Sequence, residues 1–194
     1  MKQAIEDRFP LLGGIVPIGI TFVPVTEEEF TSIETVLGVT LPIDYRDFVG
    51  EYGASAFGES VQFRLLETDP VHPVQSLLGT PIPRYEEGHL SAFYGGKEAG
   101  TYSLANALEA YKGRMPDTMI PIADDGGGNQ ICFGIKGKEH GKVYYWDHHN
   151  EWDEQDFLED YGEPMPADVK FQNVYLIAES FEDFIRRLEK TVSL

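Results

Sequence analysis

The chain has 194 residues, of which 42 % are hydrophobic and 12 % aromatic, so it can bury a sizeable core and is not expected to be disordered as a whole. Its 33 acidic against 15 basic residues give a formal net charge of −18, which argues against binding to nucleic-acid backbones and to anionic membrane surfaces. The same charge favours fast association with basic partners.

This length fits one large domain better than two small ones, and we expect a single domain over residues 1–194. Three segments within it are distinguished from the rest. They are an N-terminal extension (1–24), a proline-rich surface excursion (67–84) and an acidic segment (147–168).

Two helices are predicted after the extension. The first covers residues 27–37, because Thr26 is a good N-cap and Glu29 stands where a capping box needs its acid. The second begins at Pro42, which suits a first helical turn, and its apolar residues repeat at i, i+3, i+4 and i+7 up to Gly53. Two such helices form a hairpin whose apolar faces need a sheet to cover.

The middle of the chain alternates between strand and helix signals. Residues 61–66 are predicted to form a strand and residues 104–111 a third helix, with Ser103 as its N-cap. Strands 119–123 and 130–135 follow, on either side of a glycine-rich turn. Pro121 indicates that the first of these two strands lies at or near a sheet edge.

The last third completes the predicted sheet. Strand 143–147 should pair with strand 130–135, because both alternate apolar and polar residues. Residues 174–178 form a final short strand, and Ser180 begins a final amphipathic helix. The expected fold is α+β, with a central antiparallel sheet of about four to six strands covered by helices from the N-terminal hairpin, the middle and the C-terminus.

The sequence indicates a cytoplasmic protein. Cys132 is the only cysteine, so no internal disulfide can form. The first eight residues are too charged for a secretory signal, and the apolar run 11–20 is about half the length of a membrane-spanning helix. Nothing in the sequence indicates an oligomeric state.

The segment 124–129, Asp-Asp-Gly-Gly-Gly-Asn, is the one most easily mistaken for an active site, but it is better explained as a hairpin turn. As a calcium loop it fails, because Ile135 stands where the loop needs a glutamate. As a phosphate-binding loop it lacks the Gly-Lys-Ser/Thr ending. We therefore expect no catalytic residues and no cofactor.

Asp147, His148, His149, Glu151 and Asp153 resemble a set of metal ligands. If the preceding strand continues through the two histidines, their side chains point to opposite faces and cannot share one ion. A polar rim at the end of a strand is then the better explanation, and we expect no metal.

The acidic segment is the one candidate binding surface. It contains nine carboxylates and no Lys or Arg, interleaved with four large apolar residues. A charge run is often only a solvated face, but aromatic anchors inside a charged rim are typical of protein interfaces. The residues predicted to bind a partner are Asp147, Glu151, Trp152, Asp153, Glu154, Asp156 and Phe157.

Four blocks carry a resemblance to one family. They are residues 41–49 (Leu-Pro-Ile-Asp-Tyr-Arg-Asp-Phe-Val), 120–132 (Ile-Pro-Ile-Ala-Asp-Asp-Gly-Gly-Gly-Asn-Gln-Ile-Cys), 141–148 (Gly-Lys-Val-Tyr-Tyr-Trp-Asp-His) and 178–184 (Ala-Glu-Ser-Phe-Glu-Asp-Phe). In this order they resemble the SUKH superfamily, named partly for yeast cell-wall regulators. The chain departs from the family pattern at Phe133-Gly134, where members often carry Leu-Asp, and at Tyr52-Gly53-Ala54, where they often carry Asn-Gly-Gly.

The resemblance implies an α+β fold without shared catalytic residues. Bacterial members are typically immunity proteins that neutralise a toxin by direct binding, and fungal members are regulatory interaction proteins. Together with the charge of −18, this leads to the hypothesis of a non-catalytic immunity protein whose partner is a basic toxin domain, for instance a nuclease. A regulatory scaffold with an endogenous partner is the alternative.

Overall fold

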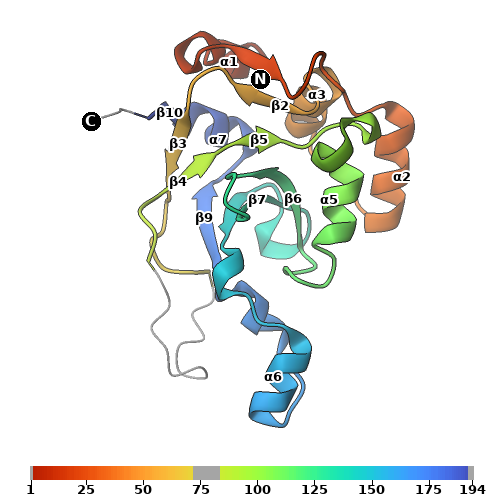
Figure 1. The fold of residues 1–194 in the computed structure, drawn as a ribbon, viewed down its shortest axis with the longest axis vertical. Coiled ribbons are helices and arrows are strands. Elements are labelled where there is room, and N and C mark those ends of the chain that lie inside the picture. Colours follow the sequence, from red (N-terminus) through yellow and green to blue (C-terminus); the bar gives the residue numbers. More distant parts are fainter. Residues whose placement is uncertain (1, 72–83, 192–194) are drawn as a thin grey trace.

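The computed structural model describes residues 2–71 and 84–191 (Figure 1). The fold is α+β, with one seven-stranded sheet and one three-stranded sheet in which all strand pairs are antiparallel. In spatial order the larger sheet contains β1 (Ile15–Pro17), β2 (Ser55–Phe57), β5 (Ala92–Phe93), β6 (Met119–Asp124), β7 (Gln130–Gly134), β8 (Val143–Trp146) and β9 (Val174–Ala178). The smaller sheet contains β10 (Glu189–Lys190), β3 (Val61–Arg64) and β4 (Glu87–Leu90).

The larger sheet has more strands than the four to six predicted. The additional strands β1, β2 and β5 are only two or three residues long and were not predicted from the sequence. Within the described residues, the α-helices are α1 (Lys2–Glu6), α2 (Glu27–Leu37), α3 (Ile43–Glu51), α5 (Leu104–Ala110), α6 (Glu154–Tyr161) and α7 (Phe181–Arg187). Short 3-10 helices cover Phe9–Leu12, Lys97–Tyr102, Gly137–Glu139, His148–Asn150 and Ala167–Phe171. In Figure 1, α2 and α5 lie together beside the sheets, and α6 projects from the lower end of the molecule.

The N-terminal helices form as the sequence predicts. The Thr26 side chain accepts a hydrogen bond from the backbone N–H of Glu29, and the Glu29 carboxylate accepts one from the Thr26 N–H, which completes the capping box. Gly38 ends α2 in the left-handed region, with φ 68°. Arg46 of α3 then binds Glu34 of α2 at 3.0 Å and joins the two helices.

The larger sheet is covered on both faces. One face carries the main core, where Tyr45 of α3 stacks on Phe133 of β7 at 5.7 Å and contacts Phe181 of α7. The other face carries a second, smaller cluster made of Met115, Met119, Cys132, Tyr144, Trp146, Val174 and Leu176. Trp146 is fully buried in this second cluster, next to the point where the chain leaves the sheet.

The edge position predicted for the strand containing Pro121 is wrong, because β6 lies between β5 and β7. The strand tolerates proline because β5 pairs with Ala123 and Asp124, and not with Pro121. A register shift between Pro121 and Ala123 adapts the pairing with β7. The strand thus combines an interior place with a locally irregular ladder.

Residues 2–24 of the extension are part of the folded body. Its β1 pairs with β2, and Ile5, Phe9 and Leu12 are buried in the main core. Of the excursion 67–84, residues 72–83 lie outside the described residues; before them, the backbone N–H of Val71 bonds to β9 at 2.8 Å. Within residues 2–71 and 84–191 no helix is both long and apolar enough to cross a membrane.

Candidate functional site

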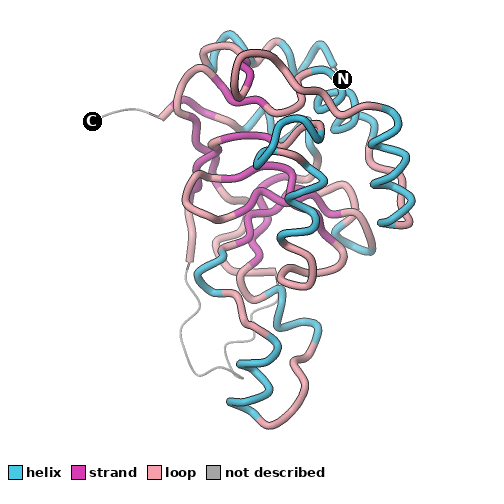
Figure 2. Tube along the Cα trace, turned by 45° about the vertical axis from the view of Figure 1, so that its right-hand side comes forward, coloured by secondary structure: helices cyan, strands magenta, loops and turns pink. Residues whose placement is uncertain are grey.

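The acidic segment forms a projecting structure, which we call the arm and define as residues 151–166 (Figures 1 and 2). Its helix, α6, begins because the Asp153 carboxylate accepts the backbone N–H groups of Gln155 and Asp156. It ends at Gly162, whose φ of 74° lies in the left-handed region. The N-cap and the C-cap glycine together define an eight-residue helix.

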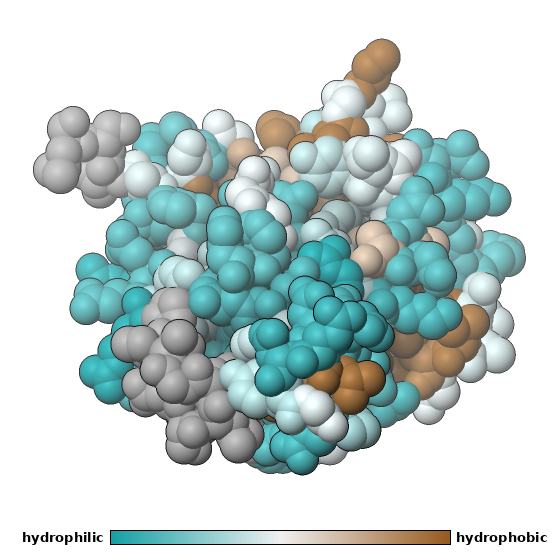
Figure 3. Space-filling view, turned by 60° about the horizontal axis from the view of Figure 1, so that its bottom comes forward, coloured by the Kyte–Doolittle hydropathy of each residue, from teal (hydrophilic) through white to brown (hydrophobic). Residues whose placement is uncertain are grey.

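The arm has a small aromatic core of its own. Phe157 is 2 % exposed, and its ring lies 5.6 Å from Trp152 and 4.6 Å from Tyr161. Leu158 and Tyr161 remain 42 % exposed. Figure 3, which shows the end of the molecule from which the arm projects, contains a small hydrophobic patch surrounded by hydrophilic residues. The arm therefore presents apolar surface within a polar rim.

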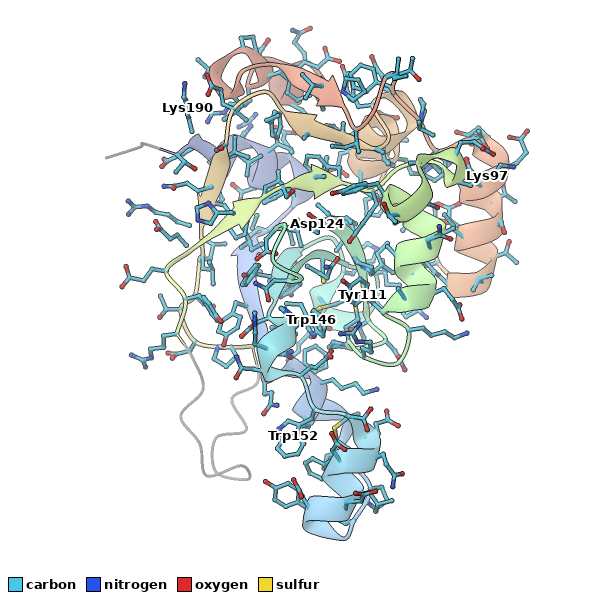
Figure 4. The ribbon with its side chains drawn as sticks, viewed as in Figure 1. Lys97, Tyr111, Asp124, Trp146, Trp152 and Lys190 are labelled. Atoms are coloured by element: carbon cyan, nitrogen blue, oxygen red, sulfur yellow. The ribbon has the colours of Figure 1, made fainter. Side chains whose placement is uncertain are left out.

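Arg114 connects the arm to the body. Its guanidinium binds both carboxylate oxygens of Glu151, at 2.7 and 3.1 Å. It also lies over the ring of Tyr111 at 4.9 Å and that of Trp146 at 5.6 Å (Figure 4). Bidentate pairs between Arg and a carboxylate are stronger than surface ion pairs with a single contact, and stacking on aromatic rings also holds the guanidinium in place.

Lys170 supplies a second connection. Its ammonium group donates to the Glu154 carboxylate at 2.7 Å and to the backbone carbonyl of Gly113 at 2.6 Å. Arg114 thus contacts the first residue of the arm and Lys170 the fourth, and Lys170 also bonds to the turn after α5. Two charged contacts therefore attach the start of the arm to the body.

At the base of the arm, the chain turns around Asp147, whose side chain is fully buried. Its Oδ2 accepts hydrogen bonds from the Tyr85 hydroxyl at 2.7 Å and from the Asn150 amide. The Asn173 amide bonds to the Asp147 carbonyl at 2.7 Å. Burial is the main cause that raises the pKa of Tyr85, and the hydrogen bond to the Asp147 carboxylate raises it further. These bonds fix the turn that leads from β8 into the arm.

The glycine-rich segment 124–129 is the hairpin turn that the sequence predicts, between β6 and β7. The Asp125 carboxylate accepts the backbone N–H groups of Gly127 and Asn129. The Asn129 side chain accepts the backbone N–H of His148 at 3.1 Å. At Gly128, with φ 106°, a Cβ would lie 2.8 Å from the His148 ring. The hairpin is therefore docked onto the base of the arm.

The structure assigns different environments to the seven residues predicted to bind a partner. Asp147 and Phe157 are buried, and Asp153 caps α6. Glu151 and Glu154 are held by Arg114 and Lys170. Asp156 is exposed and Trp152 is partly exposed.

Three carboxylates outside the predicted set lie exposed on the arm: Glu159, Asp160 and Glu163. No Lys or Arg in the described part of the chain forms an ion pair with them or with Asp156. The helical periodicity of the sequence would have indicated Asp160, since it lies four residues after Asp156 and therefore on the same face.

The premise used against a metal at the two histidines is wrong. β8 ends at Trp146, and His148–Asn150 forms a 3-10 turn instead of a continued strand. The His148 and His149 rings consequently lie on the same side, with centroids 3.8 Å apart.

Comparison with known proteins identifies the family. The model of the SMI1 / KNR4 family (SUKH-1) matches residues 24–187. A SPbeta prophage-derived uncharacterized protein, YokK, of Bacillus subtilis (strain 168) is 29 % identical over 169 residues, which cover 82 % of this chain and 72 % of the relative. The match includes the central hairpin, the base of the arm and the arm itself, and the chain belongs to the SMI1 / KNR4 family (SUKH-1).

Proposed function

We propose that this protein is a non-catalytic immunity protein that neutralises a cognate toxin by binding it through the arm. The family membership supports this proposal, because the SUKH resemblance implies direct protein binding in bacterial members. The prophage origin of one relative points the same way, since it places a related chain on a mobile element. Inside the cytoplasm, such a protein would meet its toxin at the site of damage.

One observation carries the proposal: the arm combines exposed apolar side chains with unpaired carboxylates. Leu158 and Tyr161 are each 42 % exposed. The same arm carries Asp156, Asp160 and Glu163, which are exposed and for which the described residues provide no ion-pair partner. An aromatic and aliphatic anchor within a charged rim is the arrangement found at the energetic centre of protein interfaces.

The charge distribution indicates a basic partner. The arm contains no Lys or Arg, and the whole chain carries a formal charge of −18. Such a surface accelerates encounter with a basic domain, while buried apolar contacts slow dissociation. A basic nuclease domain is a suitable partner, because its substrate-binding surface is itself positively charged.

A growth-rescue experiment tests the proposal. The gene neighbouring that of this protein is first searched for a toxin domain, and the toxin found is expressed in a sensitive host. The wild-type protein, or an arm variant carrying Asp156→Lys, Asp160→Lys and Glu163→Lys, is expressed with it. A control variant carries the same charge change at exposed acids elsewhere, Glu28→Lys, Glu86→Lys and Glu98→Lys. We expect rescue by the wild type and the control and none by the arm variant.

Equal rescue by the arm and control variants would show that neutralisation does not use the arm. Absence of rescue by the wild-type protein, together with capture of a cellular complex that lacks a toxin domain, would favour the regulatory alternative.

A further inference from the structure

A cluster of metal-ligating side chains lies at the base of the arm. Within the described residues, one donor atom from each of Asp147, His148 and His149 lies within 4.8 Å of the other two. The Asp147 side chain is fully buried, His148 is half-buried and the His149 side chain is 67 % exposed. The cluster is therefore anchored in the protein on one side and open to solvent on the other.

Asp147 is a buried carboxylate without a strong cationic partner. Tyr85 and Asn150 donate to its Oδ2, and the backbone N–H of His149 donates to its Oδ1 at 3.0 Å. In the part of the chain that the structure describes, no Lys or Arg pairs with it, and its ion-pair contact is the exposed imidazole of His149. Buried charges are normally paired or bound to a metal. This carboxylate therefore favours a nearby cation.

The spacing of two donor atoms fits a metal better than a hydrogen bond. Nδ1 of His149 lies 3.3 Å from Oδ1 of Asp147. A good N–H···O hydrogen bond is shorter, at about 2.7–3.2 Å. Two ligands of a tetrahedral ion with bonds of about 2.0–2.1 Å lie about 3.3–3.4 Å apart. These two atoms are thus spaced like neighbouring ligands of one ion.

The hydrogen bond of the His148 ring leaves its second nitrogen available to a metal. Its Nδ1 lies 2.9 Å from Oδ1 of Asn129. The Asn129 amide nitrogen donates to the Asp125 carboxylate at 2.6 Å, so the other end of this amide is an oxygen that accepts. Nδ1 of His148 therefore carries the proton, and Nε2 keeps its lone pair for a ligand bond. Ligating histidines typically donate their second N–H to a carbonyl or carboxylate in this way.

We propose that Asp147, His148 and His149 bind one divalent cation of the Zn²⁺ type, with water at the remaining coordination position. Two imidazoles and one carboxylate suit Zn²⁺, Ni²⁺ or Cu²⁺, whereas Ca²⁺ and Mg²⁺ prefer sites built from oxygen. The ion would cross-link the turn that leads into the arm. Because it binds the folded turn, it would also stabilise the folded protein.

Isothermal titration calorimetry of metal-stripped protein without an affinity tag tests this site, with Zn²⁺ alone as the probe. We expect saturable binding of one Zn²⁺ per chain and a higher melting temperature in its presence. His149→Gln should weaken binding by at least about tenfold. Because this side chain is mostly exposed, the variant should remain folded. The control variant His89→Gln, at an exposed histidine outside the cluster, should bind like the wild type.

Three results would overturn the site. The first is the absence of binding heat and of a thermal shift at millimolar Zn²⁺. The second is unchanged affinity in both His149→Gln and His148→Gln, and the third is equal binding of Mg²⁺; either of these would show attraction to surface carboxylates only. No toxin or other partner enters this experiment, so its outcome is independent of the proposed immunity function.

Discussion

Arg114 binds both carboxylate oxygens of Glu151, at 2.7 and 3.1 Å, and so joins the turn after α5 to the first residue of the arm. The same guanidinium lies over Tyr111 and over the buried Trp146. An arm residue that the sequence suggests as a partner contact is therefore used within the protein. The carboxylates left for a partner lie further along α6.

Arg114→Ala is expected to loosen the arm. The lost ion pair and cation–π contacts together contribute about 1–2 kcal/mol, which corresponds to a fall of several degrees in melting temperature. Hydrogen exchange should become faster across residues 151–166. Lys112→Ala is the control, because its 3.8 Å contact with Glu109 is exposed on both sides and contributes little. Unchanged exchange in the arm of Arg114→Ala would show that the arm does not depend on this contact.

Phe157→Ala is expected to remove the aromatic core of the arm. Loss of a buried phenylalanine costs about 3–5 kcal/mol, more than a short peripheral helix is expected to withstand. Limited proteolysis should then cut within residues 151–166 while the body stays intact. Leu158→Ala, at a neighbouring exposed side chain, should leave the cleavage rate nearly unchanged. An arm that remains resistant in Phe157→Ala would contradict this role.

Gly128→Ala is expected to destabilise the hairpin docked on the arm. The residue has φ 106°, and a Cβ would lie 2.8 to 3.1 Å from three atoms of the His148 ring. Gly141→Ala provides the matched control, because Gly141 also has a positive φ, of 85°, but has open space around it. Both variants should lose about 1 kcal/mol from backbone strain. Only Gly128→Ala should lose clearly more in urea unfolding; equal losses would show that the ring moves aside freely.

Asp124 should make stability depend on pH. Desolvation raises the pKa of its carboxyl above the ordinary 3.8, so its ionisation opposes folding. A raised folded-state pKa contributes stability below the unfolded-state value, and this contribution is lost as the pH rises through the folded-state value. Asp124→Asn should therefore gain stability over the wild type at pH 7 and not at pH 3. Urea unfolding at both pH values measures this, and an equal effect at both would contradict it.

The elements with strong local signals could be predicted from the sequence. The capping box at Thr26 and Glu29 placed α2 correctly. The alternating strands around the hairpin gave the β6–β7–β8 meander. The strands β1, β2 and β5 were missed, because each has two or three residues and is stabilised by pairing with distant segments instead of by a pattern of its own.

The site was harder to predict because its geometry depends on distant contacts. The buried Asp147 accepts a hydrogen bond from Tyr85, 62 positions away in the sequence, and no local pattern connects them. A continued strand would have pointed the side chains of His148 and His149 to opposite faces. The 3-10 turn that follows Trp146 places both rings on the same side instead. The helix of the arm has ordinary start and stop signals in Asp153 and Gly162. It was not predicted, because the many charged residues of the segment make its apolar periodicity difficult to recognise.

The central claim is that the arm binds a basic protein partner. Affinity capture from the native host at low and high salt, followed by quantitative mass spectrometry, tests it most directly. The three baits are the wild type, the Asp156→Lys/Asp160→Lys/Glu163→Lys arm variant and the Glu28→Lys/Glu86→Lys/Glu98→Lys control. We predict one stoichiometric basic partner on the wild type and the control, held more weakly as salt rises, and its loss from the arm variant. Retention of the same partner by all three baits, at equal salt sensitivity, would contradict the claim.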